Sequence, residues 1–533
     1  MELLPALHDT RLIQQRTALT ERLFSAQEAI VVACNADSAT QCVGRLPYAP
    51  TLRHLYAQAH KHGPVSMLST GVGVRAVPLV VIFVKSSASA FERLTQAAKA
   101  WKEFAHTPRQ VLFATCGMDE THDKIALEAL VAAALAGAAT MPTLKSKPPR
   151  TAALETITLV RVGAPLDLRR TLAVNRGNHL ARWLTSLPPN VLDCVSYRRA
   201  LATLARQRGW SFKFFDEAAL KRAGAGAFLA VSRANPHRDA GIVRLRYRAP
   251  KRRDSAHLAL VGKGICFDTG GINLKSHKSM YQMHEDMQGS AVAVGTLLAF
   301  TELEAPFDVD CWLALTENET GPRAYRPQDV VTAANGVTIQ VVHSDAEGRM
   351  VLADTLALAA RAKPDLIIDY ATLTGSCVMA LTERYSGAFT NRPQWRDALE
   401  LAGRCSGERV WTFPMDEDYD TDLNSSVADI LQCTLDSKGD HIFGARFLNR
   451  FVPADIPWIH LDLSASNRSG GLAHIPTEFT GFGVRFTTQL LLDHGLLGAA
   501  TAGKRSISAK ASIPRPIGRQ AATGKLARRA ARP

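Results

Sequence analysis

The chain has 533 residues, of which 46% are hydrophobic and 21% are charged, as in an ordinary soluble protein with a sizeable core. Its length favours more than one domain. No apolar stretch reaches the roughly 18 residues that a membrane helix requires, and no secretory signal is visible. Nine cysteines without a CxxC pair are typical of free, mostly buried thiols in a reducing compartment. We therefore predict a cytoplasmic protein without membrane contact.

The net charge is +14 at pH 7, and nine of these positive charges lie in residues 501–533, which contain no acid. The Ala, Ser, Pro and Gly content of this segment cannot bury enough apolar surface to fold alone. The sequence therefore predicts a basic disordered tail over residues 499–533. Such a tail can contact nucleic acid or another acidic partner through charge, or it can be a solvated extension.

Residues 1–165 are predicted to form a smaller N-terminal α/β domain. Residues 29–34 and 77–84 have the continuous apolar character of buried strands, whereas 90–105 and the stretch after Asp123 have helical periodicity. A further helical pattern begins near Leu168 and ends at a double proline, so residues 166–190 are predicted to be a linker helix.

Residues 191–498 alternate between strand and helix patterns and are predicted to form a larger catalytic domain. The strand patterns cover residues 210–215, 242–247, 257–262, 309–315, 337–343, 365–373 and 458–463. This alternation predicts an α/β fold with a central mixed, largely parallel sheet flanked by helices. Active sites in such sheets lie where strands end in loops; Lys263 and Asp345 each follow a predicted strand, and Thr372 follows residues 365–370 of another.

One carboxylate-rich segment precedes the helix pattern that starts at Met350. Asp345, Glu347 and Arg349 occupy alternate positions there, and alternate residues of an extended segment point to the same side. The pattern therefore predicts that two carboxylates and one guanidinium converge on one point. Taken alone, the two acids would be typical of a loop or a helix cap.

A second cluster lies upstream in a glycine-rich stretch and contributes Lys263, Asp268, Lys275 and Asp286. Four buried carboxylates repel one another unless they are offset by counter-charge, which two divalent cations can supply. Next to such ions Lys263 can bind as a neutral amine, whereas Lys275 and Arg349 stay charged and stabilise a developing oxyanion. Oxygen ligands with one nitrogen are compatible with Mn, Zn or Mg.

Several other classes lack their characteristic patterns. The chain has no GxxxxGK[ST] or GxGxxG pattern for nucleotide binding and no GxSxG nucleophile, and its cysteines show no zinc-site spacing. A dinuclear phosphoesterase remains an alternative on the metals alone, although such sites are commonly rich in histidine.

At these residues the chain resembles the leucyl aminopeptidase family of dinuclear metallo-exopeptidases. The family signature NTDAEGRL is matched by residues 343–350, and the likeness continues in residues 187–190, 261–275, 317–331, 369–381 and 458–463. The resemblance is strong over residues 170–495. It is weak over the first 165 residues, where only the two-domain layout is similar.

The resemblance implies a metal-dependent aminopeptidase in which a hydroxide shared by two metals attacks the first peptide bond. It assigns one metal to Lys263, Asp268, Asp286 and Glu347, and a second, more exchangeable metal to Asp268, Asp345 and Glu347. Lys275 would polarise the scissile carbonyl, and Arg349 would anchor a bicarbonate ion that acts as general base. Family members are hexamers that act on peptides, so a homohexamer working in cytoplasmic peptide turnover is expected.

The same resemblance implies a pocket for the N-terminal side chain, lined by Met283, Thr372, Gly375 and Ser464, with His343 in the subsite beyond the scissile bond. Ser464 stands where the family usually has Ala, and His343 stands where it usually has Asn. A hydroxyl makes the pocket smaller or more polar, so strict leucine preference is not expected. Because some family members also bind DNA, a DNA-binding or regulatory role, added or instead, is the alternative.

Overall fold

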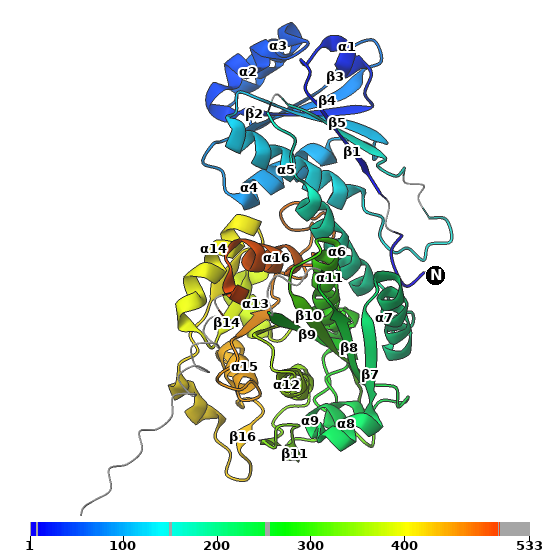
Figure 1. Cartoon of the computed structure of the whole chain (residues 1–533), viewed down its shortest axis with the longest axis vertical. Helices are drawn as coiled ribbons and strands as arrows, with labels where there is room; N and C mark the ends of the chain where they lie inside the picture. The colour runs from blue at the N-terminus through cyan, green and yellow to red at the C-terminus, as the bar shows by residue number, and fades with distance from the viewer. Residues whose placement is uncertain are drawn as a thin grey trace, which may run out of the picture.

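The computed structural model describes residues 2–6, 9–148, 152–161, 163–250, 256–498 and 500. These residues form two α/β units, each built on its own sheet, and the units follow one another along the long axis of the molecule (Figure 1). The basic tail predicted over residues 499–533 lies outside the described residues, apart from Ala500.

The N-terminal unit has a six-stranded mixed sheet in the order β1-β6-β5-β2-β4-β3. Its strands are β1 Arg11–Gln15, β2 Ala29–Asn35, β3 Met67–Val72, β4 Val77–Val84, β5 Gln110–Cys116 and β6 Thr156–Val160. Its helices are α1 Glu21–Ser25, α2 Ala39–Arg45, α3 Ala49–His60, α4 Ala90–Lys102 and α5 Glu120–Ala138. The strands predicted at 29–34 and 77–84 and the helix predicted at 90–105 are confirmed.

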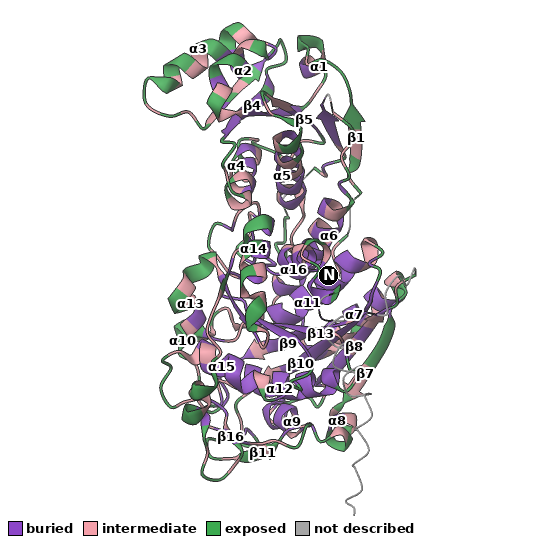
Figure 2. Cartoon of the chain, turned by 60° about the vertical axis from the view of Figure 1, so that its left-hand side comes forward, coloured by how far each residue is buried: buried purple, intermediate pink, exposed green. Residues whose placement is uncertain are grey.

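Both faces of this sheet are covered by helices, because alternate residues of its strands enter two separate cores. Val31 packs with α4 and α5, whereas its neighbour Val32 packs with α1, α2 and α3. Figure 2 shows α4 and α5 below the sheet and α2 and α3 above it. The near-continuous apolar sequence of β2 follows from this double burial.

The larger unit has an eight-stranded mixed sheet in the order β15-β14-β17-β13-β9-β10-β8-β7. Its strands are β7 Ser211–Asp216, β8 Gly241–Tyr247, β9 His257–Asp268, β10 Asp308–Asn318, β13 Leu366–Ala371, β14 Ser386–Thr390, β15 Val410–Thr412 and β17 Trp458–Asp462. The central strands β17, β13, β9 and β10 are parallel, whereas β8 is antiparallel to β10 and β7 is antiparallel to β8. The predicted mixed sheet is confirmed.

Helices cover this sheet on both sides as well. One core joins Leu260 of β9 to helices of one layer, and the other joins Val261 of the same strand to helices of the opposite layer (Figure 2). The first layer includes α6 Arg169–Thr185, α7 Cys194–Arg208, α11 Gln288–Glu302, α14 Arg396–Ser406 and α16 Val484–Asp493. The second includes α8 Glu217–Ala223, α9 Gly226–Ser232, α12 Glu347–Ala360 and α15 Asp440–Asn449.

Two expectations about strand ends are wrong. The strand predicted at 257–262 continues to Asp268, so Lys263 lies within β9 rather than after it. Gly262 explains the continuation, because a Cβ there would lie 2.4 Å from the Cα of Ser290, and its absence lets α11 pack closely on an unbroken strand.

The second wrong expectation concerns the strand predicted at 337–343. Only β12 Thr338–Gln340 forms, and it pairs with β11 Val330–Thr332 and β16 Ile430–Leu431 in a separate three-stranded sheet. None of the helices in the described part of the chain combines the length and the apolar character that a membrane crossing requires.

Candidate metal centre

A cavity of about 1360 Å³ lies at the carboxyl ends of β9, β13 and β17. Every site residue expected from the sequence lines this cavity: Lys263, Asp268, Lys275, Met283, Asp286, His343, Asp345, Glu347, Arg349, Thr372, Gly375 and Ser464. The cavity therefore brings together segments that are up to 200 residues apart in the chain, as the strand-end rule for α/β sheets predicts.

The buried acidic and basic side chains come from three elements around this edge of the sheet. β9 provides Lys263 in its middle and Asp268 as its last residue. Asp286 lies on the short 3-10 helix η2 Met283–Met287, and Glu347 is the first residue of α12. Gly348 allows the contact between β9 and α12, because a Cβ there would lie 2.6 Å from Cε of Lys263.

Each of the two lysine ammonium groups bridges two carboxylates. Lys263 Nζ lies 2.8 Å from Asp286 Oδ1 and 3.1 Å from Glu347 Oε1, and it donates to the backbone carbonyl of Thr372. Lys275 Nζ lies 2.9 Å from Asp268 Oδ2 and 2.6 Å from Asp345 Oδ1. The four carboxylates are thus drawn around two neighbouring cationic positions.

The pKa values of this cluster show how strongly its carboxylates require positive charge. Burial, together with the negative charge of Asp268, raises the pKa of Asp286 to about 6 and raises the pKa of Glu347 well above its ordinary value. Burial by itself would lower the pKa of Lys263, but the adjacent carboxylates of Asp286 and Glu347 raise it above the ordinary lysine value.

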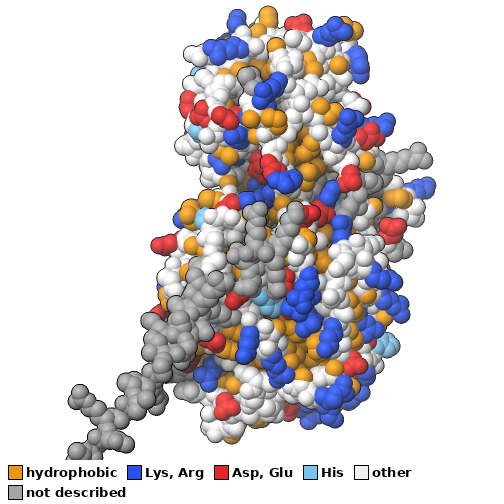
Figure 3. All heavy atoms as spheres, viewed as in Figure 1, with side chains coloured by type: hydrophobic (Ala, Val, Ile, Leu, Met, Phe, Trp, Pro, Cys, Tyr) orange, Lys and Arg blue, Asp and Glu red, His pale blue; other side chains and the backbone are white. Residues whose placement is uncertain are grey.

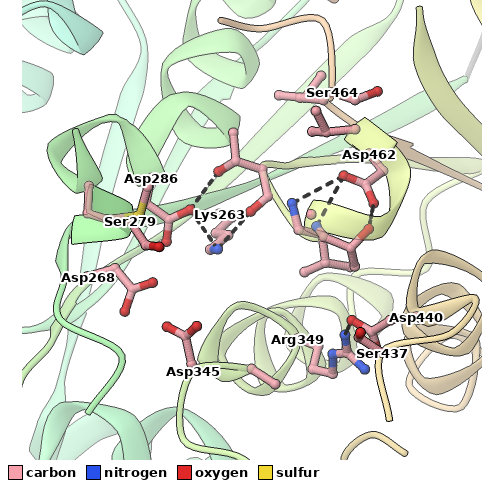
Figure 4. Close-up of a pocket in the computed structure, with 18 of the residues that line it drawn as sticks. Lys263, Asp268, Ser279, Asp286, Asp345, Arg349, Ser437, Asp440, Asp462 and Ser464 are labelled. Carbon is pink, nitrogen blue, oxygen red and sulfur yellow. Dashed lines mark hydrogen bonds and ion pairs between the residues drawn. The ribbon is translucent and has the colours of Figure 1, made fainter. Parts of the chain in front are cut away.

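The donor set fits divalent metal ions. One oxygen from each of Asp268, Asp286 and Glu347 can be chosen so that all three lie within 4.8 Å of one another. Asp286 Oδ2 is buried and has no hydrogen-bond partner among the described residues, which is the state of an oxygen free to bind an ion. Figure 4 shows the carboxylates of Asp268 and Asp345 facing each other beside this group. Hard oxygen donors with one amine nitrogen suit Mn, Zn or Mg.

Arg349 does not converge with Asp345 and Glu347 as the alternate spacing predicted. α12 begins at Glu347, so Arg349 already lies in its first turn and is rotated by roughly 200° about the helix axis from Glu347. Arg349 Nη2 donates to Asp440 Oδ2 at 2.7 Å, and Nη1 donates to the backbone carbonyl of Gln432 at 3.3 Å (Figure 4). The guanidinium lines another part of the same cavity.

Two residues that sequence reasoning missed, Asn318 and Asp440, contact site residues directly, and Thr372 makes a contact that was not expected of it. Asn318 Nδ2 donates to Asp268 Oδ1 at 2.8 Å, and Thr372 Oγ1 donates to Asp286 Oδ1 at 2.8 Å, although Thr372 was expected only in the side-chain pocket. Asn318 ends β10 beside β9, so the strand-end rule could have identified it. Asp440, the partner of Arg349, carried no signal in the sequence.

Ser464 follows β17 and lines the cavity with Met283, Thr372 and Gly375. Its hydroxyl donates to the backbone carbonyl of Tyr385 at 2.7 Å, so its proton is already engaged within the chain. Gly375 begins α13 Gly375–Leu381, and a Cβ there would meet no atom within 4 Å. The residues expected to form the side-chain pocket therefore lie together in the structure.

Comparison with known proteins agrees with this geometry. Residues 179–488 match the catalytic-domain model of the cytosol aminopeptidase family. A probable cytosol aminopeptidase of Corynebacterium diphtheriae is 37% identical over 354 residues, which cover 65% of this chain and 70% of the relative.

Two solved structures share the fold over most of the chain. A mutant of tomato leucine aminopeptidase has a TM-score of 0.77 at 25% identity, and the matched part covers 92% of this chain and 98% of the tomato chain. The bottromycin maturation enzyme BotP, solved in complex with Mn, has a TM-score of 0.76 at 27% identity, and the matched part covers 89% of this chain and 100% of the BotP chain.

Proposed function

The chain belongs to the cytosol aminopeptidase family of M17 metallopeptidases, and from that premise we propose that it removes N-terminal residues from peptides in the cytoplasm by means of a two-metal centre. The observation that carries the proposal is the buried group of Asp268, Asp286 and Glu347, whose oxygens converge beside two lysine ammonium groups. We also propose, on the family resemblance, that the chain forms a homohexamer and acts in peptide turnover.

The proposed ligand sets are Lys263, Asp268, Asp286 and Glu347 for one ion, and Asp268, Asp345 and Glu347 for a more exchangeable second ion. When bound, the two ions supply Lewis-acid activation of a water molecule and of the scissile carbonyl. Mn or Zn is the expected occupant, since a related enzyme was solved with Mn, and Mg is a third candidate.

The chain's own residues orient the peptide and stabilise charge. Lys275 stays protonated because the carboxylates of Asp268 and Asp345 raise its pKa despite burial, so it can stabilise the oxyanion that develops at the attacked carbonyl. Met283, Thr372, Gly375 and Ser464 accept the N-terminal side chain. His343 faces the part of the peptide beyond the scissile bond.

Bicarbonate fits the structure at Arg349 less well than divalent metal ions fit the carboxylate–lysine cage. This cage consists of Lys263, Asp268, Lys275, Asp286, Asp345 and Glu347. The guanidinium is already paired with Asp440 at 2.7 Å, so a bicarbonate ion has to displace a carboxylate that belongs to the chain. We therefore propose that Asp440 supplies, within the chain, the anion that the resemblance assigns to bicarbonate.

A substitution at the shared ligand tests the proposed function. Glu347→Gln keeps the shape of the side chain but removes the charge that both ions require, so hydrolysis of aminoacyl p-nitroanilides is expected to fall by at least about 100-fold. Asp436→Asn is the matched control, because Asp436 is an exposed acid at the rim of the same cavity and outside the cage. Full activity in Glu347→Gln would exclude the proposed centre.

Nucleic-acid binding is a second candidate function. A hollow of about 720 Å³ is lined by Lys213, Arg222, Arg244 and Arg361 together with Trp312. Figure 3 shows Lys and Arg side chains gathered on the side of the molecule where β7 and α8 lie. If the basic tail adds to this surface, salt-sensitive retention on DNA is expected to disappear on deletion of residues 501–533 while aminopeptidase activity remains. Unchanged retention would remove the tail from the proposal.

A further inference from the structure

Three cysteines meet in the N-terminal unit, far along the chain from the carboxylate cavity. Cys34 lies near the end of β2, Cys116 is the last residue of β5, and Cys42 lies on α2. Their Sγ atoms all lie within 4.8 Å of one another. Cys34 and Cys116 are direct partners in the parallel register of the two strands, and α2 places Cys42 against them.

The three thiols are enclosed. Cys34 is fully buried, Cys42 is 2% exposed, and Cys116 is the only half-buried member of the cluster. The chain turns closely over the sulfurs at Gly117, where φ is +70° and a Cβ would lie 2.5 Å from Cys42 Sγ. A side chain at this position would displace Cys42, so the glycine keeps the space around the sulfurs free.

Cys34 and Cys42 belong to the apolar core on this face of the sheet, and the thiols also make polar contacts within the cluster. Cys42 Sγ donates to the backbone carbonyl of Cys116 at 3.3 Å and lies 3.4 Å from the hydroxyl of Ser38. The thiols must lose their protons before the sulfurs bind a metal ion, because the thiolate is the form that binds metal.

The spacing of the sulfurs suits a single thiophilic ion. Zn–S bonds are about 2.3 Å, which places two sulfurs on one tetrahedral ion about 3.8 Å apart. An adjustment of about 1 Å from the observed upper limit is within the range of small side-chain rotations. Ser38 Oγ or a water molecule can complete the coordination, and the displaced thiol protons pass to solvent.

We propose that Cys34, Cys42 and Cys116 form a thiolate site for a soft metal ion of the Zn²⁺ or Cu⁺ class, separate from the carboxylate centre. Soft sulfur donors select these ions, whereas the oxygen donors of the cavity accept Mn²⁺ and Mg²⁺. The two sites would therefore take different metals in one chain. This proposal does not depend on the proposed aminopeptidase mechanism.

Titration of the reduced full-length protein with Cd²⁺ tests the site, with Mn²⁺ present in excess to occupy the carboxylate cavity. Cd–thiolate bonds give an ultraviolet charge-transfer band that carboxylates do not give. We expect the band to saturate at one ion per chain and Cys42→Ser to weaken Cd²⁺ binding by more than about 10-fold. Zn²⁺ and Cu⁺ are expected to suppress the band by competition.

Cys194→Ser is the matched control, because it removes a buried thiol from the Cys194–Cys266 pair, whose sulfurs lie 3.9 Å apart and which, within the described part of the chain, has no third metal-ligating side chain beside it. It is expected to leave the band unchanged. If Cys42→Ser does not fold, protection of Cys34, Cys42 and Cys116 from a thiol reagent by Zn²⁺ in the wild-type chain replaces that variant. An unaltered band in Cys42→Ser, no protection, or a disulfide mapped among these three residues would overturn the proposal.

Discussion

Asp440 is the residue at which this site departs most clearly from the expectation set by its family. Its carboxylate lies 2.7 Å from Arg349 Nη2, inside the cavity that also holds the carboxylate–lysine cage. A guanidinium–carboxylate pair of this kind is a fixed, charge-assisted contact rather than an exchangeable anion site. We therefore propose that this carboxylate takes the place that the resemblance gives to a bound bicarbonate.

Removal of that carboxylate is expected to make the enzyme depend on an external anion. Asp440→Ala should lower kcat by about 10- to 100-fold with little change in KM, and added bicarbonate or formate should restore much of the loss. The wild-type enzyme should be insensitive to bicarbonate. Kinetics in bicarbonate-free buffer check this, and a wild-type enzyme that requires bicarbonate would contradict it.

Ser464 is expected to restrict the side-chain pocket. Its hydroxyl donates a hydrogen bond to the Tyr385 carbonyl, and an Ala side chain at this position leaves that carbonyl without this donor but makes the pocket wall apolar. Ser464→Ala should shift selectivity toward larger apolar residues by a few-fold to about 10-fold. Relative kcat/KM values for alanyl, leucyl and phenylalanyl substrates measure the shift, and unchanged ratios would reject this role.

At the scale of elements, α12 connects the site to the rest of its layer through a buried acid. Asp354 accepts hydrogen bonds from the backbone N–H groups of Phe228 and Ala334, at 2.8 and 2.7 Å, and so fixes α9 and the segment before β12. Burial raises the pKa of Asp354 from its ordinary value of 3.8 to about 7.

This shift predicts the direction of a pH effect on stability. Between pH 3.8 and about 7 the folded chain keeps the proton of Asp354 while the unfolded chain loses it, so rising pH favours unfolding. The contribution is fully present below pH 3.8 and is lost as pH rises through about 7, by up to about 4 kcal/mol. Denaturant unfolding of Asp354→Asn should therefore show a flatter dependence on pH than the wild type. An identical slope in both proteins would contradict the assignment.

Local patterns predicted the type of most elements, but they did not predict where β9 ends or where α12 begins. Strands at 29–34 and 77–84 were recognisable from continuous apolar runs and those at 242–247 and 458–463 from strand patterns, and the structure has β2, β4, β8 and β17 there. The end of β9 was missed because Gly262 serves close packing against α11 rather than a turn.

The site was predictable to the extent that its residues lie in contiguous motifs. The residues of the carboxylate–lysine cage all line the cavity, whereas the direction of Arg349 depended on whether α12 begins before or after it. The Arg349–Asp440 contact joins residues 91 positions apart, and Cys116 lies 74 positions from Cys42. Contacts between residues so far apart in the chain depend on the tertiary fold, so no local sequence pattern could reveal them.

At the scale of the whole molecule, the two sheets hold two chemically distinct clusters. The three thiols lie between the N-terminal sheet and α2, on the face covered by α2 and α3, and the larger sheet carries the oxygen-rich cavity at its strand ends. The family match over residues 179–488 covers the larger sheet and the cavity but not the thiols. Aminopeptidase activity is therefore expected to depend on metal ions bound in the cavity of the larger unit and not on the ion proposed for the three thiols.

Metal content measured together with activity tests the central claim most directly. Protein stripped with a chelator should lose aminopeptidase activity and regain it as Mn²⁺ is added, with two ions bound per chain at saturation. Asp345→Asn should retain one tightly bound ion at the Lys263 and Asp286 side and lose the second. A folded protein that binds no divalent ion in the cavity, and that hydrolyses aminoacyl amides equally well in excess chelator, would contradict the account.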